Sequence, residues 1–263
     1  MTTIITGETR LFPILGDPIA QVRSPRYLTE ILARRGINAI VPPMHVAPQD
    51  LAATVQTLRA IKNVGGLVIT IPHKIPTLAL CDEVSERARF VGSVNIVRKE
   101  ADGRLIGDNV DGIGYLDGIR KQGFEVDGKR ALLIGAGGAG SAVAYEILER
   151  GATYLGIYDI DPERLSALVT RLDQKFPGRV GVQRNCPDGY DLIANVTPVG
   201  MKAGDPYPVD VEKFHAGQFV ADAITKPEVS PMVEVARSVG CNTMTGEGMF
   251  NAEAEILVDF MCQ

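Results

Sequence analysis

The sequence predicts an α/β protein of two domains: a mixed α/β domain at the N-terminus and a doubly wound parallel sheet at the C-terminus. Apolar runs of strand length alternate with helical patterns along all 263 residues, which is typical of this fold class. A glycine-rich turn between an apolar strand and a helix opens the second half of the chain near residue 135. The last amphipathic segment, 250–262, has no further strand to cover, so we expect it to return to the first domain.

The first domain is expected to start with a strand at 10–16 and a helix at 23–36. Ser24 is the expected N-cap of that helix, Pro25 fits its first turn, and Gly36 ends it. The alternation then continues through strands at 39–46 and 65–72, helices at 48–63 and 74–82, and a hairpin at 93–109.

The second domain is expected to start near Asp111 with a helix at 112–123. Its later elements are a strand at 131–134, a second strand running into 156–161, strands at 190–196 and 219–224, and a helix at 230–240 capped by Ser230. The predicted domains are therefore 1–110 with 245–263, and 111–244.

Composition excludes several classes of partner. The formal net charge of −5 and the pI near 5.3 lack the basic excess that binding to nucleic acid requires. No basic and apolar leader opens the sequence, and no apolar run approaches the roughly 20 residues that cross a bilayer. The four cysteines show no CxxC spacing and the three histidines form no cluster. We expect a cytoplasmic monomer or homodimer with no metal, no nucleic-acid partner and no membrane partner.

The glycine turn is the first candidate site. Gly135, Gly137 and Gly140 have the G-x-G-x-x-G spacing, directly after an apolar strand and at the start of a helix. In this context the glycines allow a tight turn, a close approach of a pyrophosphate and close helix packing. The motif predicts a Rossmann-type dinucleotide site over Gly135–Gly140, a range that also includes Ala136, Gly138 and Ala139.

Asp159 lies 24 residues after Gly135, about where the adenosine ribose of a dinucleotide is expected. The alternative is that the glycines only make a turn and that Asp161 only caps the next helix, which leaves Asp159 without a role. Its carboxylate would accept ribose hydroxyls and repel a 2′-phosphate. No arginine follows the strand directly, and Arg164 is expected to face solvent from the helix. The predicted cofactor is NAD, with NADP possible.

Lys74 is the best candidate for the group that takes the hydroxyl proton during oxidation of an alcohol. It follows a buried strand, where partial desolvation would lower its pKa, and a carboxylate would hold it in place. Asp111 stands at the domain junction and is the expected carboxylate. Each residue also has a structural alternative. Lys74 could be a solvated lysine at the start of a helix, and Asp111 could be a turn residue before Gly112. His73 is a weaker candidate for substrate contact.

Several motifs resemble those of the shikimate/quinate dehydrogenase family, from end to end of the chain and in the family's order. They are the Ser-Pro after the first strand, VITIPHK, SVNIV with GDNVDG, GAGGAGSA, NVTPVGM and GEGMFNAEA. The resemblance implies reversible NAD(P)-dependent oxidation of a ring hydroxyl on a cyclic polyhydroxy carboxylate such as shikimate or quinate.

The resemblance also assigns roles to residues of this sequence. It implies that Lys74 and Asp111 are the catalytic pair, and that Thr70, Asn95 and Asp111 contact substrate hydroxyls. Ser24 matches the second of two serines that hold the substrate carboxylate. The remaining matches are to the cofactor site: the glycine turn, Asp159, Thr197, Gly248 and Met249.

Four positions depart from the family pattern and alter the expected substrate pocket. Val22 replaces the first carboxylate-binding serine, Val68 an asparagine, Thr225 a tyrosine, and Glu253 a glutamine that contacts substrate. Each lost donor is expected to weaken the bound group by about 1–3 kcal/mol, and Glu253 would repel an anionic substrate. Arg23 could restore a cation, or be a surface arginine.

Two functions stay open on the sequence. The first is a dehydrogenase of the shikimate dehydrogenase-like branch that acts on shikimate, quinate or a related acid, such as an aminoshikimate-type compound. The second is an NAD-binding sensor or regulatory relative with weak turnover. The presence of both Lys74 and Asp111 favours the enzyme, because a binding protein needs no proton-transfer pair.

Overall fold

The computed structural model describes residues 5–263 and divides into two compact units. The first unit comprises the chain up to Val110 together with Ala254–Gln263, and the second comprises Asp111–Glu253. Residues 1–4 of the first predicted domain lie outside the described residues. Residues 245–253, which we assigned to the first domain, group with the second unit, because the division falls inside one long helix, α9 (Gly246–Met261).

The first unit is built on a six-stranded mixed sheet. Its strands are, in spatial order, β4 (Pro43–His45), β2 (Ile14–Gly16), β5 (Gly66–Ile69), β7 (Ile96–Lys99), β8 (Leu105–Asp108) and β6 (Glu83–Val84). Strands β4, β2 and β5 are parallel, whereas β7 runs antiparallel to both β5 and β8. The predicted hairpin at 93–109 is therefore confirmed. A separate pair, β1 (Arg10–Leu11) and β3 (Ala39–Ile40), completes the strands of this unit.

Four helices accompany this sheet: α1 (Ser24–Arg34), α2 (Leu51–Ala60), α3 (Lys74–Thr77) and α4 (Glu86–Val91). Three apolar residues of α1 are buried, at Leu28, Ile31 and Leu32. The predicted cap of α1 is wrong, however, because Arg23 already has helical backbone angles and occupies the N-cap, which makes Ser24 the first helical residue. Three positions of α2, namely Leu51, Val55 and Leu58, join the buried cluster on the sheet.

The end of α9 packs within the first unit, as the last amphipathic segment predicts. Arg34 and Arg35, at the end of α1, both form ion pairs with Glu255, and Arg35 lies 2.6 Å from Asp259. The guanidinium of Arg98 lies 5.1 Å from the ring centre of Phe260. These contacts bring α9 to the unit that contains the N-terminus.

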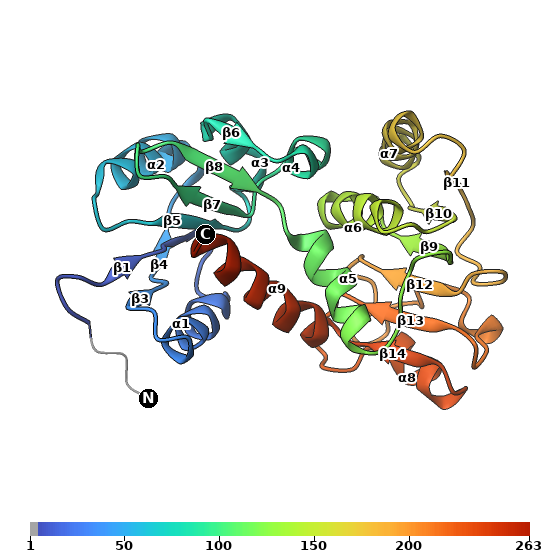
Figure 1. Cartoon of the computed structure of the whole chain (residues 1–263). Helices are drawn as coiled ribbons and strands as arrows, with labels where there is room; N and C mark the ends of the chain where they lie inside the picture. Colours follow the sequence, from blue (N-terminus) through green and yellow to red (C-terminus); the bar gives the residue numbers. More distant parts are fainter. Residues whose placement is uncertain (1–4) are drawn as a thin grey trace. The chain divides into compact units, whose positions relative to one another are not determined.

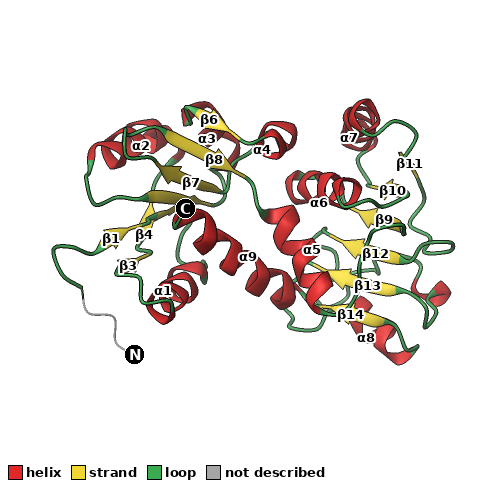
Figure 2. Ribbon diagram, viewed as in Figure 1, coloured by secondary structure: helices red, strands yellow, loops and turns green. Residues whose placement is uncertain are grey.

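The second unit has a six-stranded sheet in which every neighbouring pair is parallel. The order is β11 (Val180–Val182), β10 (Tyr154–Tyr158), β9 (Arg130–Ile134), β12 (Leu192–Asn195), β13 (Phe219–Asp222) and β14 (Asn242–Met244). Figures 1 and 2 show these strands side by side. In chain order this arrangement is 3-2-1-4-5-6, that of a doubly wound dinucleotide-binding sheet. The Rossmann-type prediction is confirmed.

The helices of the second unit are α5 (Asp111–Lys121), α6 (Gly138–Glu149), α7 (Pro162–Lys175), α8 (Pro231–Ser238) and the first part of α9. Helices α6 and α7 contact β9–β11, and α8 contacts β13 and β14. The central strands are buried on both faces, which explains their continuous apolar runs in the sequence. The outer strands β11 and β14 were not predicted, because three-residue edge strands leave no comparable run.

Candidate functional site

The glycine turn begins directly after β9. Gly135 has a φ of +109°, a conformation that glycine adopts without strain, and its N–H donates to the Tyr158 carbonyl at 2.8 Å. A Cβ on Gly140 would lie 2.1 Å from the Gly135 carbonyl oxygen, so only glycine lets α6 pack against the turn. Among the described residues, a Cβ on Gly137 or Gly138 would meet no atom within 4 Å. The turn therefore packs tightly against the backbone at Gly140, whereas at Gly137 there is free space next to the backbone.

Asp159 follows β10 and holds the turn in place. One carboxylate oxygen accepts the N–H of Ala136 at 2.6 Å, and the other accepts the N–H of Asp161 and the Arg164 guanidinium, each at 2.8 Å. Burial by itself would raise the pKa of Asp159, but the Arg164 guanidinium and these N–H groups bring it below its ordinary value. The carboxylate is therefore ionised at neutral pH and has a structural role beside the predicted one.

Arg164 is exposed on the helix, as the sequence predicts, but it also pairs with Asp159 beside the predicted dinucleotide site. Helix α7 begins at Pro162, and Asp161 caps it by accepting the N–H groups of Glu163 and Arg164. Arg164 therefore lies in the first helical turn, close to the strand end. Its side chain is 47% exposed, pairs with Asp159 and lines the same cavity. An arginine is consequently available beside the predicted ribose position.

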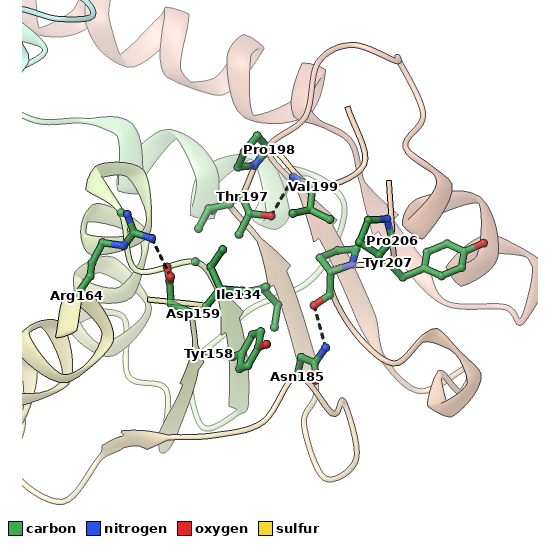
Figure 3. Close-up of a pocket in the computed structure, with 15 residues that line it drawn as sticks. Ile134, Tyr158, Asp159, Arg164, Asn185, Thr197, Pro198, Val199, Pro206 and Tyr207 are labelled. Carbon is green, nitrogen blue, oxygen red and sulfur yellow. Dashed lines mark hydrogen bonds and ion pairs between the residues drawn. The ribbon is translucent and has the colours of Figure 1, made fainter. Parts of the chain in front are cut away.

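A cavity of about 450 Å³ lies beside the glycine turn (Figure 3). Its wall comes from the ends of β9 and β10, from the segment after β12, and from the loop at 206–208. Several of its lining residues are not among the predicted cofactor-binding residues, for instance Tyr158, Asn185, Val199 and Tyr207. Its volume lies within the usual range for small-molecule sites. With Gly137 open and Asp159 at the wall, these residues fit a dinucleotide.

Thr197, which lines this cavity, is held by a buried hydrogen-bond network. Both the N–H and the hydroxyl of Thr197 donate to the Asn195 side-chain oxygen, at 3.1 and 2.7 Å. The Asn195 amide donates in turn to Asp222 at 3.1 Å, and the Ser230 hydroxyl donates to the other Asp222 oxygen at 2.6 Å. The predicted cap is confirmed here, because Ser230 accepts the N–H of Val233. The network links the start of α8 to the cavity wall.

Asp222→Asn is expected to remove a pH dependence of stability. Burial raises the pKa of Asp222 above its unfolded value. A raised carboxyl pKa favours the folded state most below the unfolded value, about pH 4, and that contribution is lost as pH rises through the folded pKa. The stability advantage of the wild type over Asp222→Asn should therefore shrink as pH rises. Urea unfolding at several pH values between 4 and 8 measures this, and a difference that grows with pH would contradict it.

In the first unit, the strand directions bring two predicted substrate residues, Thr70 and Asn95, and the predicted catalytic Lys74 to one edge of the sheet. Thr70 follows the end of β5, and Asn95 precedes β7, which runs the opposite way. Backbone bonds join the two segments, from Ile69 N–H to the Asn95 carbonyl at 2.8 Å and from Val94 N–H to the Lys74 carbonyl at 2.9 Å. Asn95 is buried and its side-chain oxygen accepts the N–H of Val110. Ligands of α/β sheets bind at such carboxyl edges.

Ser24 lies at the start of α1 in the same unit, beside two residues that change the predicted carboxylate site. Val22 and Arg23 line an open hollow of about 540 Å³. The Arg23 guanidinium donates to the Tyr27 hydroxyl at 2.8 Å and stacks over the Tyr27 ring. Arg23 is exposed and contacts Tyr27, an arrangement that fits both alternatives, a cation for the carboxylate and a surface arginine.

Asp111 and Glu253 both belong to the second unit. Asp111 is buried at the start of α5, 6% exposed. One turn further, a Cβ on Gly114 would lie 2.7 Å from the Cβ of Glu253, so α9 packs closely over α5 at this point. Gly248 contributes to the same packing opposite Gly118, and Met249 follows it in α9. Lys74 belongs to the first unit, so its pairing with Asp111 stays a prediction.

His73 is a structural residue. Its ring is fully buried, and its Nε2 hydrogen-bonds to the Val46 carbonyl at 2.8 Å. Nδ1 is buried and has no partner within the described part of the chain. A residue that is 0% exposed offers no surface for the substrate contact that was the weaker prediction for His73.

Among residues 5–263, no group of three or more His, Cys, Asp or Glu side chains is placed to hold a metal ion. Over the same range, we find no helix with the length and apolar character that a membrane span requires.

Comparison with known proteins identifies the family. Residues 14–97 match the family model described as the shikimate dehydrogenase substrate binding domain. A shikimate dehydrogenase (NADP(+)) from Rubrobacter xylanophilus is 39% identical over 251 residues, covering 93% of this chain and 88% of that protein.

Solved structures agree with this match along almost the whole chain. A shikimate 5-dehydrogenase from Listeria monocytogenes, in complex with shikimate and NAD, has a TM-score of 0.92 at 26% identity and covers 100% of this chain and 94% of its own. The ligand-free 5-ketofructose reductase of Gluconobacter sp. strain CHM43 has a TM-score of 0.91 at 27% identity, covering 96% and 92%. The two-unit fold, the glycine turn and these matches place the chain in the shikimate dehydrogenase family of NAD(P)-linked oxidoreductases.

Proposed function

We propose that this protein reversibly oxidises a ring hydroxyl of shikimate, quinate or a related cyclic polyhydroxy acid, with a nicotinamide dinucleotide as cofactor. The observation that carries the proposal is the edge of the first sheet, which holds Thr70, Lys74 and Asn95. There the Ile69 N–H donates to the Asn95 carbonyl, and the Val94 N–H donates to the carbonyl of Lys74, the first residue of α3. A relative solved with shikimate and NAD has the same fold over the whole chain.

In the proposed reaction, Lys74 takes the hydroxyl proton during oxidation and returns it during reduction, and Asp111 orients the lysine and the hydroxyl. The bound nicotinamide supplies the hydride acceptor. Ser24, Thr70, Asn95 and Glu253 contact the substrate.

On the cofactor side, the range Gly135–Gly140 holds the pyrophosphate at the N-terminus of α6, where unpaired N–H groups and the helix dipole favour anions. Asp159 and Thr197 line the adenosine side of the cavity. Gly248 and Met249 lie near the nicotinamide in this proposal.

We further propose that NAD is preferred and NADP is also used. The buried Asp159 carboxylate opposes a 2′-phosphate, which supports NAD. The Arg164 guanidinium lies against that carboxylate and lines the cavity, so it offers a 2′-phosphate a cation. The relatives named for NADP(+) are consistent with its use. We also propose a cytoplasmic location, which the four free thiols favour.

Arg164→Gln is expected to reduce kcat/KM for NADP by about tenfold or more, because a charged hydrogen bond contributes about 1.5–3 kcal/mol. The same change should alter kcat/KM for NAD by less than about threefold. Nicotinamide absorbance with each cofactor measures both, and Arg171→Gln, a variant in the same helix, is the control. Equal losses with the two cofactors would contradict the assignment of Arg164.

The substrate is tested with a panel of shikimate, quinate and aminoshikimate-type acids, each assayed with NAD and NADP. We expect turnover of at least one acid, with the higher kcat/KM for NAD. No oxidation of any cyclic polyhydroxy acid at millimolar concentration would overturn the proposed activity.

A second candidate is an uncharged polyhydroxy ketone. Val22 and Glu253 both disfavour a bound carboxylate, one by removing a donor and the other by adding a negative charge. One structural neighbour is named a 5-ketofructose reductase. Adding uncharged ketoses and polyols to the panel separates the two substrate classes. Glu253→Gln should raise activity with acids selectively if the acid is the substrate.

A further inference from the structure

A hollow of about 640 Å³ on the first unit is lined by residues that the proposed reaction does not use. It lies where β1, the segment before β5 and the end of β7 run side by side. The Gly65 N–H donates to the Leu11 carbonyl at 2.9 Å, and the Lys99 N–H donates to the Gly65 carbonyl at 2.9 Å. The C-terminal end of α2 and the β7–β8 turn complete its wall. The hollow is thus built by tertiary contacts between three stretches of the chain, namely β1, residues 59–65 and residues 99–103.

Two of its cations are held in fixed positions. The Arg10 guanidinium lies 5.1 Å from the ring centre of Phe12. A Cβ on Gly65 would lie 2.5 Å from an Arg10 nitrogen, so the glycine makes room for this side chain. The Lys99 ammonium donates to two carbonyls at the end of α2, at 2.6 and 3.1 Å. An ammonium has three donors, so one remains for a ligand.

The two carboxylates that line the hollow are already paired. Glu100 lies 2.6 Å from a nitrogen of Arg98, and Asp102 lies 2.8 Å from a nitrogen of Arg104. Neither arginine lines the hollow. The carboxylates therefore do little to neutralise the cations that face it.

Carboxylates neutralise only part of the positive charge on the basic side chains that line the hollow. Arg59 forms an ion pair with Asp82 at 3.0 Å. Within residues 5–263, Arg10 and Lys62 form no ion pair with a carboxylate. A chain with a net charge of −5 therefore concentrates four lining cations, Arg10, Arg59, Lys62 and Lys99, around one hollow.

We propose that this hollow binds a small-molecule oxyanion with at least two negative charges, held between Arg10, Lys62 and Lys99. Guanidinium and ammonium groups are the usual partners of phosphate and carboxylate oxygens. The volume suits a metabolite-sized ligand better than a single inorganic ion. A phosphate ester and a polycarboxylate share this chemistry. The site belongs to the first unit alone, so it is independent of the cofactor cavity and of the proposed reaction.

Isothermal titration of the whole protein with pyrophosphate and with citrate tests the site, with saturating NAD present so that the cofactor cavity is filled. We expect saturable binding of one of them with a Kd at or below about 1 mM, weakening as salt is added. Pyrophosphate binding indicates a phosphate-bearing ligand, and citrate binding a polycarboxylate.

Lys62→Gln is the decisive variant, because Lys62 lies on an exposed turn and its replacement is expected to leave the fold intact. It should weaken binding by about tenfold or more, and Arg10→Gln should do the same. Lys121→Gln, which changes an exposed lysine of the second unit, should leave the Kd unchanged. The proposal is overturned if neither anion binds at about 10 mM, or if Lys62→Gln and Lys121→Gln bind equally well.

Discussion

Lys74→Ala is expected to lower kcat by about 10²- to 10⁴-fold, the usual contribution of a positioned acid or base. Lys74 begins α3 in the first unit, whereas the dinucleotide cradle belongs to the second. Affinity for NAD should therefore stay within about twofold of wild type. Steady-state kinetics measure the first effect, and titration of NAD measures the second.

Lys121→Ala is the matched control, because Lys121 is an exposed lysine at the end of α5. It should keep wild-type turnover. If Lys74→Ala turns over substrate as fast as wild type, Lys74 is not the proton acceptor. If the wild type binds NAD but oxidises no member of the substrate panel, the protein is the NAD-binding sensor that the sequence left open.

Alanine at two glycines of the turn should produce two different losses. Gly140→Ala places a Cβ 2.1 Å from the Gly135 carbonyl oxygen, and such overpacking costs about 1–3 kcal/mol. The variant should unfold at lower urea concentration and bind the dinucleotide poorly. Gly137→Ala has open space around its Cβ and lines the cavity. It should fold normally yet bind NAD at least about tenfold more weakly, because the Cβ keeps the pyrophosphate from the backbone.

Gly7→Ala is the control for both, since a Cβ there meets no described atom within 4 Å and Gly7 lies far along the chain from the turn. Urea unfolding and NAD titration of the three variants separate the two effects. Normal NAD affinity in Gly137→Ala would show that the pyrophosphate does not bind where we propose. Unchanged stability in Gly140→Ala would mean that α6 can shift away from the turn.

A capping motif in the sequence predicts the N-cap correctly only where the residue before the helix has the extended backbone angles that a cap requires. Ser24 and Ser230 both precede a proline, and the sequence predicts that both are caps. Ser230 has extended backbone angles and accepts the N–H of Val233, as predicted. Before Ser24 the chain is already helical at Arg23, so the cap position moves back by one residue. The direction in which the preceding chain reaches the helix decides whether the serine is the N-cap or the first helical residue, and tertiary packing sets that direction.

The sequence by itself determined the α/β class, the glycine turn, the capping of α7 by Asp161 and the family resemblance, because these depend on residue type and spacing along a short stretch. Only the tertiary structure placed Arg164 against Asp159, joined Thr197 to Asp222 and gathered the basic hollow on the first unit. Some of those contacts join segments that are distant in the sequence. Others depend on how a helix is rotated about its axis, which the sequence does not show. Packing of buried apolar surface sets that rotation, and a linear pattern does not record it.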